Sequence, residues 1–315
     1  MAKEVKKPSK KREAVAGRVR KLSKKQAKGK AKKEVKTRKP FPGSFKLTWQ
    51  VVKTLKQHWK TLGGIVLVYL ILNIIFASGI SNVSTTFSNI KADLNASGGQ
   101  NLWHAAGGFA SLVGSSGASG SSAGSALQSA LFVIESLVII WALRHLLSGQ
   151  AVSVKLAYYR SMMPLIPFLL VIAVIIIQLL PVSIGATVLA AIATSVFTGT
   201  SVATAFSAVA FVLLAMWSLY MVSSSIFALY IVTLPDMQPR QALRSARDLV
   251  RFRRLIVIRK VLFLPLLILV TMGVVIVPLI LYASSIVPAV FYVLSMVAIL
   301  FVHTYLYSLY RGMLE

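Results

Sequence analysis

An uncharged stretch of 75 residues, Ser161–Pro235, constrains this chain more than any other feature. A helix or strand at the surface of a soluble protein carries charge on its exposed face, whereas about 20 predominantly apolar residues cross one bilayer core. A second stretch, Val261–Tyr310, contains no Lys, Arg, Asp or Glu and only one histidine, His303. These two stretches predict a membrane-embedded protein.

The positions of the cations predict how the chain is oriented. Of the 35 Lys and Arg residues, 22 fall within residues 1–62, and most of the others cluster at 144–160 and 240–260. Cationic flanks of membrane spans stay in the cytoplasm. Because the long uncharged stretch is cationic on both sides, it must cross the membrane an even number of times. We therefore expect a multi-pass protein of the cell membrane with both termini in the cytoplasm.

Six transmembrane helices satisfy these flanks. The apolar segments are continuous, whereas strands of a membrane barrel alternate apolar and polar residues, so helices are favoured. The fold class is therefore all-α integral membrane, with residues 81–125 and 194–205 on the outer side and helix extension in the longest segment. The predicted spans are Leu62–Ile80, Ala126–Leu147, Pro164–Thr187, Phe206–Leu234, Val261–Tyr282 and Ile286–Ser308.

The chain divides into a basic tail at residues 1–43 and a membrane domain at residues 44–315. Residues 1–40 are rich in lysine and contain no aromatic residue, so they have too little apolar surface to fold and we expect disorder. A polycation of this kind binds either anionic lipids of the inner leaflet or nucleic acid, including the ribosome. The absence of aromatic stacking groups argues against recognition of single strands. Binding to the lipid surface, or a role as a topology signal alone, is favoured over nucleic acid.

Residues 44–62 show helical periodicity with one apolar face and a basic edge. The basic edge consists of Lys46, Lys53 and Lys60. Tryptophans on such a face lie at the level of the lipid headgroups, and the lysines reach phosphates. This pattern predicts an interfacial helix. Its apolar face comprises Phe45, Trp49, Val52, Leu55, Trp59 and Leu62.

A short amphipathic segment recurs before the first, third and fifth predicted spans. The three copies begin at Ser44, Ser153 and Ala242. Each opens a cytoplasmic segment that leads into a pair of spans. This layout predicts three repeats of an interfacial helix plus a helical hairpin, covering residues 44–147, 153–234 and 242–310.

The third copy also carries a resemblance to a known family. Its segment Pro239–Arg254 reads PRQALRSARDLVRFRR and precedes a span. This pattern resembles the polytopic membrane domain attached to some bacterial glycerophosphoryl diester phosphodiesterases, together with stand-alone relatives of unassigned function. The resemblance covers about residues 44–310 and does not include the phosphodiesterase catalytic domain. It implies a membrane fold and no activity.

Arginines in this segment are spaced to form one stripe on a helix. Asp248 lies four residues after Arg244 and three before Arg251, which is close enough to moderate the repulsion. The stripe could recognise phosphate, either on lipid headgroups or on a phosphorylated partner. The simpler interpretation is a topology signal that lies on the leaflet. Its members are Arg240, Arg244, Arg247, Arg251 and Arg254.

Glu135 is the only acidic residue inside a predicted span, and ionisable groups in a membrane need a partner or a water-filled cavity. At 1.5 Å per residue from the cytoplasmic ends, Glu135 lies roughly 18 Å deep, with Asn73 at about 16 Å, Gln178 at about 21 Å and Tyr220 at about 18 Å. These depths predict one polar layer. The layer is either a transport pathway or, as we favour, a hydrogen-bonded contact between helices.

No motif for catalysis, a cofactor or a metal stands out. The chain has no cysteine, and its four histidines are scattered, which argues against a metal site. We therefore expect no enzyme, no cofactor and no catalytic residue. The leading hypothesis is an envelope-associated scaffold whose basic surface contacts anionic lipid. The alternatives are a transporter or lipid-handling protein around Glu135, and a membrane tether for nucleic acid or ribosomes through the tail.

Overall fold

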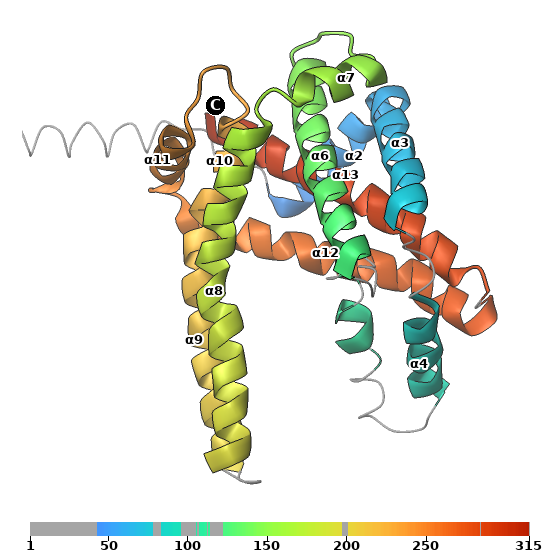
Figure 1. Cartoon of the computed structure of the whole chain (residues 1–315), viewed down its shortest axis with the longest axis vertical. Helices are drawn as coiled ribbons and strands as arrows, with labels where there is room; N and C mark the ends of the chain where they lie inside the picture. Colours follow the sequence, from blue (N-terminus) through green and yellow to red (C-terminus); the bar gives the residue numbers. More distant parts are fainter. Residues whose placement is uncertain are drawn as a thin grey trace, which may run out of the picture. The chain divides into compact units, whose positions relative to one another are not determined.

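The computed structural model describes residues 43–77, 83–95, 105, 107–111, 113, 122–196, 201–283 and 285–314. Within these ranges the chain forms helices joined by turns and contains no strand (Figure 1). The helices are α2 (Ser44–Gln57), α3 (Trp59–Ala77), α4 (Val83–Asn95), α6 (Ser122–Leu147), α7 (Val154–Ser161), α8 (Leu165–Val196), α9 (Ser201–Ser225), α10 (Ala228–Ile231), α11 (Pro239–Val250), α12 (Arg254–Tyr282) and α13 (Val287–Leu314).

Six helices in the described part of the chain are long and apolar enough to cross a membrane. This agrees with the predicted all-helical membrane class and with the order of the predicted spans. The six segments are Trp59–Phe76, Ala126–Leu147, Leu165–Leu189, Ala208–Ile231, Arg254–Tyr282 and Val287–Leu314.

The helices α8 and α9 form the longest hairpin and lie side by side along their length (Figure 1). Much of the segment that we expected between them, 194–205, belongs to the helices themselves, so the extra length of the uncharged stretch is helix extension. Gly185 of α8 faces Leu214 of α9, and a Cβ atom on this glycine would collide with the leucine side chain. A small residue here therefore lets the two backbones approach closely.

A short helix precedes each pair of long helices, as the recurring segments predicted: α2 before α3 and α6, α7 before α8 and α9, and α11 before α12 and α13. The side chain of Ser153 caps α7 by accepting a hydrogen bond from the backbone N–H of Leu156 at 3.3 Å. Helix α11 starts with Pro239, whose fixed φ suits the first turn. The equivalence of the three units as repeats stays a prediction.

Helix α2 has two apolar sides. Leu47 and Val51 are buried, and α2 contacts α13. The predicted interfacial face points elsewhere: Phe45 is 78% exposed and Trp49 is 74% exposed. Large exposed aromatic side chains at the start of a membrane domain are typical of an interfacial anchor. Sequence periodicity identified the exposed aromatic residues but wrongly included Leu62, which is fully buried on α3. It also missed the face that packs on α13.

Part of the predicted outer segment is folded onto the end of the α12–α13 pair. Phe87 and Ile90 of α4 are buried in a cluster with Met272 and Ile276 of α12 and Phe291 of α13. The rings of Phe87 and Phe291 meet edge to face, with centroids 5.3 Å apart. The sequence placed residues 81–125 on the outer side and predicted no helix there. The Gly/Ser run at 114–120 lies outside the described residues.

A glycine makes the turn between α6 and α7 possible. Gly149 has a φ of 81°, in the left-handed region that favours glycine. The backbone N–H groups of Gly149 and Gln150 donate to the carbonyls of Leu146 and His145 at 3.1 and 3.0 Å, which satisfies the last turn of α6. The chain is thereby directed into α7, which packs back against α6 and α3.

Candidate functional site

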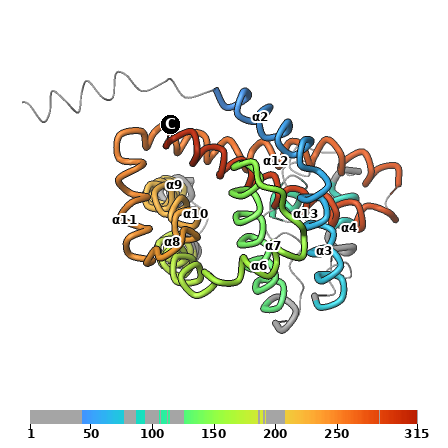
Figure 2. Tube along the Cα trace, turned by 90° about the horizontal axis from the view of Figure 1, so that it is seen from above, coloured from blue at the N-terminus to red at the C-terminus, as the bar shows by residue number. Residues whose placement is uncertain are grey.

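A cavity of about 720 Å³ lies where α11 and the start of α12 meet the α8–α9 hairpin. Figure 2 shows α11 beside α8, α9 and α10, and these helices are in contact. Four of the five predicted stripe arginines line the cavity, and we call it the arginine cavity. Its lining residues are Val174 and Gln178 of α8, Tyr220, Met221, Ser224 and Ser225 of α9, Leu243, Arg244, Arg247 and Asp248 of α11, and Arg251 and Arg254.

The sequence of α11 explains how two of these arginines reach the cavity. Ala242, Ala246 and Val250 recur every four residues and are buried, and α11 contacts α8, α9 and α10. The two alanines lack long side chains, so the α11 backbone lies close to its neighbours. Arg244 and Arg247 are one turn apart on an exposed part of the helix. We call them the α11 pair.

The predicted stripe does not continue on one helix. Helix α11 ends at Val250, residues 251–253 form a turn, and Arg254 is the first residue of α12. The Arg254 guanidinium lies over the Tyr220 ring, 4.2 Å from its centroid, and this cation–π contact holds it at the cavity wall. Arg251 and Arg254 form a second group, the turn pair. Arg240 is exposed and does not line the cavity.

The charges in the cavity are unbalanced. Four guanidinium groups face one carboxylate, that of Asp248, so the lining has an excess of three positive charges. Among the described residues, no hydrogen bond or ion pair engages the side chains of Arg244, Arg247 or Asp248. Guanidinium groups stay charged and present several donors in a fixed fork that matches phosphate oxygens. The cavity therefore offers unused donors to an anionic ligand.

Neutral polar groups continue the cavity along the hairpin. The side-chain Oε1 of Gln178 is buried without a hydrogen-bond partner. Ser224 and Ser225 donate their hydroxyls to the backbone carbonyl of Met221 at 2.9 and 3.4 Å, which leaves their oxygen lone pairs as acceptors. Ser218 donates to the backbone carbonyl of Gln178 at 2.7 Å and joins α9 to α8. The cavity thus has a charged end lined by the arginines and an uncharged polar end lined by Gln178, Ser224 and Ser225.

The predicted polar layer divides between two places. Gln178 and Tyr220 line the arginine cavity, whereas Glu135 bonds to a residue of α7 and Asn73 is buried on α3, which packs on α6. Our depth for Tyr220 assumed one unbroken helix over the predicted span Phe206–Leu234. In the structure α9 already ends at Ser225, so Tyr220 lies about one and a half turns from that end and contacts Arg254.

Glu135 takes part in a buried, hydrogen-bonded contact between helices. Its side chain is 1% exposed, and its Oε2 accepts a hydrogen bond from the Tyr158 hydroxyl of α7 at 2.8 Å. The same hydroxyl lies 3.1 Å from the backbone carbonyl of Ile65 in α3. Burial, and then the neighbouring Glu135 carboxyl, raise the pKa of Tyr158 above its ordinary value, so this hydroxyl keeps its proton and serves as the donor.

Asn73 shares this environment without a hydrogen bond among the described residues. It is fully buried at 0% exposure, and neither polar atom of its amide has a partner. Oε1 of Glu135 is also buried and unpartnered. Neither residue lines the arginine cavity. The arrangement is that of polar groups packed between helices.

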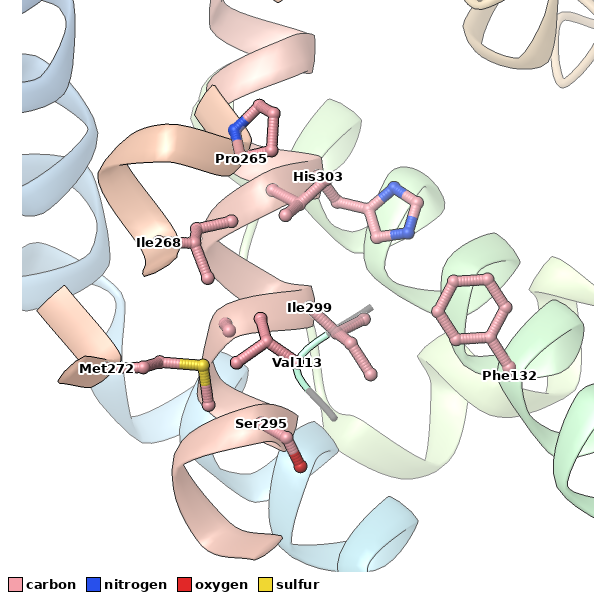
Figure 3. Close-up of a pocket in the computed structure, with 10 residues that line it drawn as sticks. Val113, Phe132, Pro265, Ile268, Met272, Ser295, Ile299 and His303 are labelled. Carbon is pink, nitrogen blue, oxygen red and sulfur yellow. The ribbon is translucent and has the colours of Figure 1, made fainter. Parts of the chain in front are cut away.

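A histidine that the sequence left unassigned joins three helices. His303 of α13 is buried, with Nε2 3.0 Å from the Ser136 hydroxyl of α6 and Nδ1 3.3 Å from the Tyr230 hydroxyl of α10. Figure 3 shows its ring pointing toward Phe132, at the edge of a cavity of about 240 Å³ whose lining is mostly apolar. The partners are too distant in sequence for spacing to reveal them.

Arg144 near the end of α6 was also missed, because the sequence suggested only a topology signal. Its guanidinium donates to the backbone carbonyls of Thr233 and Tyr230 at 2.6 and 2.8 Å, and to the Thr233 hydroxyl at 2.5 Å. It therefore ties α6 to the segment that follows α9. Carbonyls at a helix end need such donors.

The predicted basic edge near the N-terminus lies apart from the arginine cavity. Lys46 and Lys53 are exposed on α2, and Lys60 is exposed at the start of α3. None of the three lines the arginine cavity. The basic tail, for which we predicted lipid or nucleic-acid binding, lies outside the described residues.

Comparison with known proteins adds no relative. No family model matches the chain, and neither a curated protein nor a solved structure matches it. The six apolar helices define the class as a multi-pass membrane protein. The resemblance to the membrane domain of glycerophosphoryl diester phosphodiesterases stays a prediction.

Proposed function

We propose that this protein is a non-enzymatic, envelope-associated membrane scaffold that binds anionic phospholipid in the arginine cavity. The observation that carries the proposal is the excess of three positive charges in a cavity beside an apolar hairpin. Basic pockets between membrane helices on the cytoplasmic side are a known type of site for anionic headgroups. A scaffold of this kind holds its position by recognising a lipid class.

The surroundings of the cavity favour a lipid over a soluble anion. Helices α8 and α9 expose large apolar side chains, including Ile177, Leu213 and Trp217. An acyl chain can cover such side chains while its phosphate contacts the arginines. A soluble phosphorylated partner would leave the apolar surface unused. This combination supports a ligand with a charged headgroup and an apolar tail.

The proposed orientation places the arginine cavity at the cytoplasmic leaflet. The cation distribution supports this, because Arg160, Arg244 and Arg311 all follow or precede apolar helices on the same predicted side. The exposed aromatic residues of α2 support an interfacial position for the N-terminal end of the membrane domain. Both termini are proposed to be cytoplasmic in the cell membrane.

Titration of the purified full-length protein in neutral detergent would test the proposal. We expect fluorescent phosphatidylglycerol to bind and phosphatidylcholine with the same chains to bind much more weakly. Replacing Arg244, Arg247, Arg251 and Arg254 together with Gln should remove this preference. Arg240→Gln is the matched control, because Arg240 lies on the same helix outside the cavity.

Three outcomes would count against the proposal. Equal affinity for the two lipids in the unmodified protein would exclude headgroup recognition. An unchanged preference in the fourfold variant would place recognition elsewhere, for example in the tail. Displacement of the lipid by a phosphorylated peptide at lower concentration than by phosphatidylglycerol would make a soluble partner the better ligand.

The two alternative functions have weaker support. A transporter around Glu135 requires a pathway, whereas the Glu135 carboxylate is buried and bonded to Tyr158. A tether for nucleic acid or ribosomes rests on the composition of residues 1–40 alone. Both stay proposals.

A further inference from the structure

We propose that the preferred ligand of the arginine cavity is a lipid headgroup that carries two phosphoryl groups, one for each arginine pair. This inference rests on the proposed function, because it specifies which anionic lipid the cavity takes. The two phosphoryl groups are either joined directly, as in a diphosphate, or bridged by a short polyol. The shared chemistry is two phosphates on one headgroup.

The four arginines come from two separate structural elements. Arg244 and Arg247 belong to α11, whereas Arg251 follows the end of that helix and Arg254 opens α12. The break at residues 251–253 interrupts the helical stripe. Each pair supplies enough donors to bind one phosphate bidentately. Two sets of donors on different structural elements suit two phosphoryl groups better than one.

The charge of the cavity also favours a ligand with more than one phosphate. One phosphodiester carries a single negative charge and would leave two of the three excess positive charges in the cavity unmatched. Two phosphoryl groups bring two or more negative charges. Because the like charges of the arginines repel one another and attract an anion in proportion to its charge, the more highly charged headgroup is favoured.

The volume and the polar lining of the cavity suit a headgroup larger than one phosphate. A volume of about 720 Å³ exceeds what a single phosphate fills. The polar end of the cavity contains the buried, unpartnered amide oxygen of Gln178. The hydroxyl groups of Ser224 and Ser225 already donate to the backbone carbonyl of Met221, so only their oxygens are available, as acceptors. These acceptors suit hydroxyl groups of a polyol bridge. The cavity can thus hold more than one phosphate at its arginine-lined end.

The test compares four lipids on the full-length protein in neutral detergent, each competing with the same fluorescent phosphatidylglycerol. Cardiolipin carries two bridged phosphodiesters, and a polyprenyl diphosphate carries two directly linked phosphoryl groups. Phosphatidylglycerol and phosphatidic acid carry one phosphate, as a diester and a monoester. We expect at least one two-phosphate lipid to bind roughly tenfold or more tightly than both single-phosphate lipids, since the second phosphate adds charge-assisted hydrogen bonds.

Variants of each pair sharpen the test. Arg244→Gln with Arg247→Gln, and separately Arg251→Gln with Arg254→Gln, should each bring the affinity for the two-phosphate lipid close to that for phosphatidylglycerol. Binding of the single-phosphate lipid should persist in both. Arg240→Gln should retain the full difference. Monodisperse elution and an unchanged unfolding midpoint would show that each variant is folded.

One part of the test uses only the unmodified protein. Inorganic diphosphate should displace the fluorescent lipid from the unmodified protein at lower concentration than inorganic phosphate does, if the two phosphoryl groups are directly linked. If only cardiolipin shows the advantage, the bridged arrangement is identified, and the proposal stands.

The outcomes separate this inference from the function it rests on. If phosphatidic acid or phosphatidylglycerol binds as tightly as both two-phosphate lipids, anionic lipid binding stands and the two-phosphate inference is wrong. The same conclusion follows if each pair of substitutions weakens all four lipids in equal proportion. If none of the four anionic lipids binds better than phosphatidylcholine, the proposed function fails as well.

Discussion

The region around α6 and α13 and the region around α8, α9 and α11 use polar residues in opposite ways. Half of the α6 and α13 spans is buried, against 11% of the α8 span. In the first region Glu135, His303 and Arg144 each bond to a neighbouring helix or segment. In the second, Arg244 and Arg247 line a cavity without a bond to a described residue.

This difference separates structural polar groups from those available to a ligand. A buried polar group stabilises a membrane protein only when its hydrogen bonds are made within the chain. An exposed arginine beside a cavity has no such requirement, because water or a ligand solvates it. Removing a group of the first kind should lower stability, and removing one of the second should lower ligand affinity with little effect on stability.

The largest expected loss of stability follows Arg144→Leu. This substitution removes three hydrogen bonds from a charged donor and leaves the carbonyls of Tyr230 and Thr233 without it. We expect a decrease of about 2–3 kcal/mol in the free energy of unfolding, measured by titration with SDS in mixed micelles. Arg160→Leu is the control, because Arg160 is exposed on α7. Equal effects of the two substitutions would contradict the role of Arg144 as a tie between helices.

Glu135→Leu should have the next largest effect on stability. The substitution leaves the Tyr158 hydroxyl without its carboxylate acceptor, and polar contacts of this kind in membranes contribute about 0.6–2 kcal/mol. Glu135→Gln should cost less, because an amide oxygen still accepts from Tyr158. The same unfolding titration ranks the two. If Leu is tolerated as well as Gln, the contact does not stabilise the fold.

Tyr220→Leu should affect ligand affinity more than stability. The Tyr220 ring holds the Arg254 guanidinium through a cation–π contact, which contributes about 0.5–1 kcal/mol at an exposed site. We therefore expect anionic lipid affinity to fall roughly two- to fivefold. Tyr220→Phe keeps the ring and should retain the affinity. An equal loss in the Phe variant would assign the effect to the hydroxyl instead.

Removal of residues 1–40 should have the smallest effect on the membrane domain. Lys46, Lys53 and Lys60 still mark the cytoplasmic side of the first span, so insertion and the unfolding midpoint should stay the same. Affinity for anionic vesicles or RNA should lose a component that salt weakens. Parallel assays on vesicles and RNA identify the partner. Unchanged binding to both would exclude an electrostatic role for the tail.

The sequence predicted the helices well and their polar contacts poorly, and the reason is physical. Apolar length and cation placement determine where a span lies, and both are local properties of the chain. They located the α3, α6 and α8 spans to within a few residues at each end. They did not locate the end of α9, because an apolar run continues through the turn at Ile226 and Phe227.

Polar contacts depend on tertiary distances that spacing does not contain. The stripe of arginines was recognised, but a helical wheel kept Arg240 with Arg254, whereas the break after Val250 separates them. Depth counting grouped Tyr220 with Glu135, and the structure instead pairs Tyr220 with Arg254. The partners of His303 are Ser136 and Tyr230, which lie far away in the chain and carry no motif.

The contact of α2 with α13 sets an order for assembly during synthesis. Leu47 and Val51 lie near the start of the described chain, and the helix that α2 packs on, Val287–Leu314, lies at its end. Helices α3 and α6 also contact α13. Helices α3 and α6 therefore cannot complete their packing until α13 has emerged from the ribosome. Early spans must wait in the bilayer, with surfaces that α13 later covers still open to lipid or to the insertion machinery.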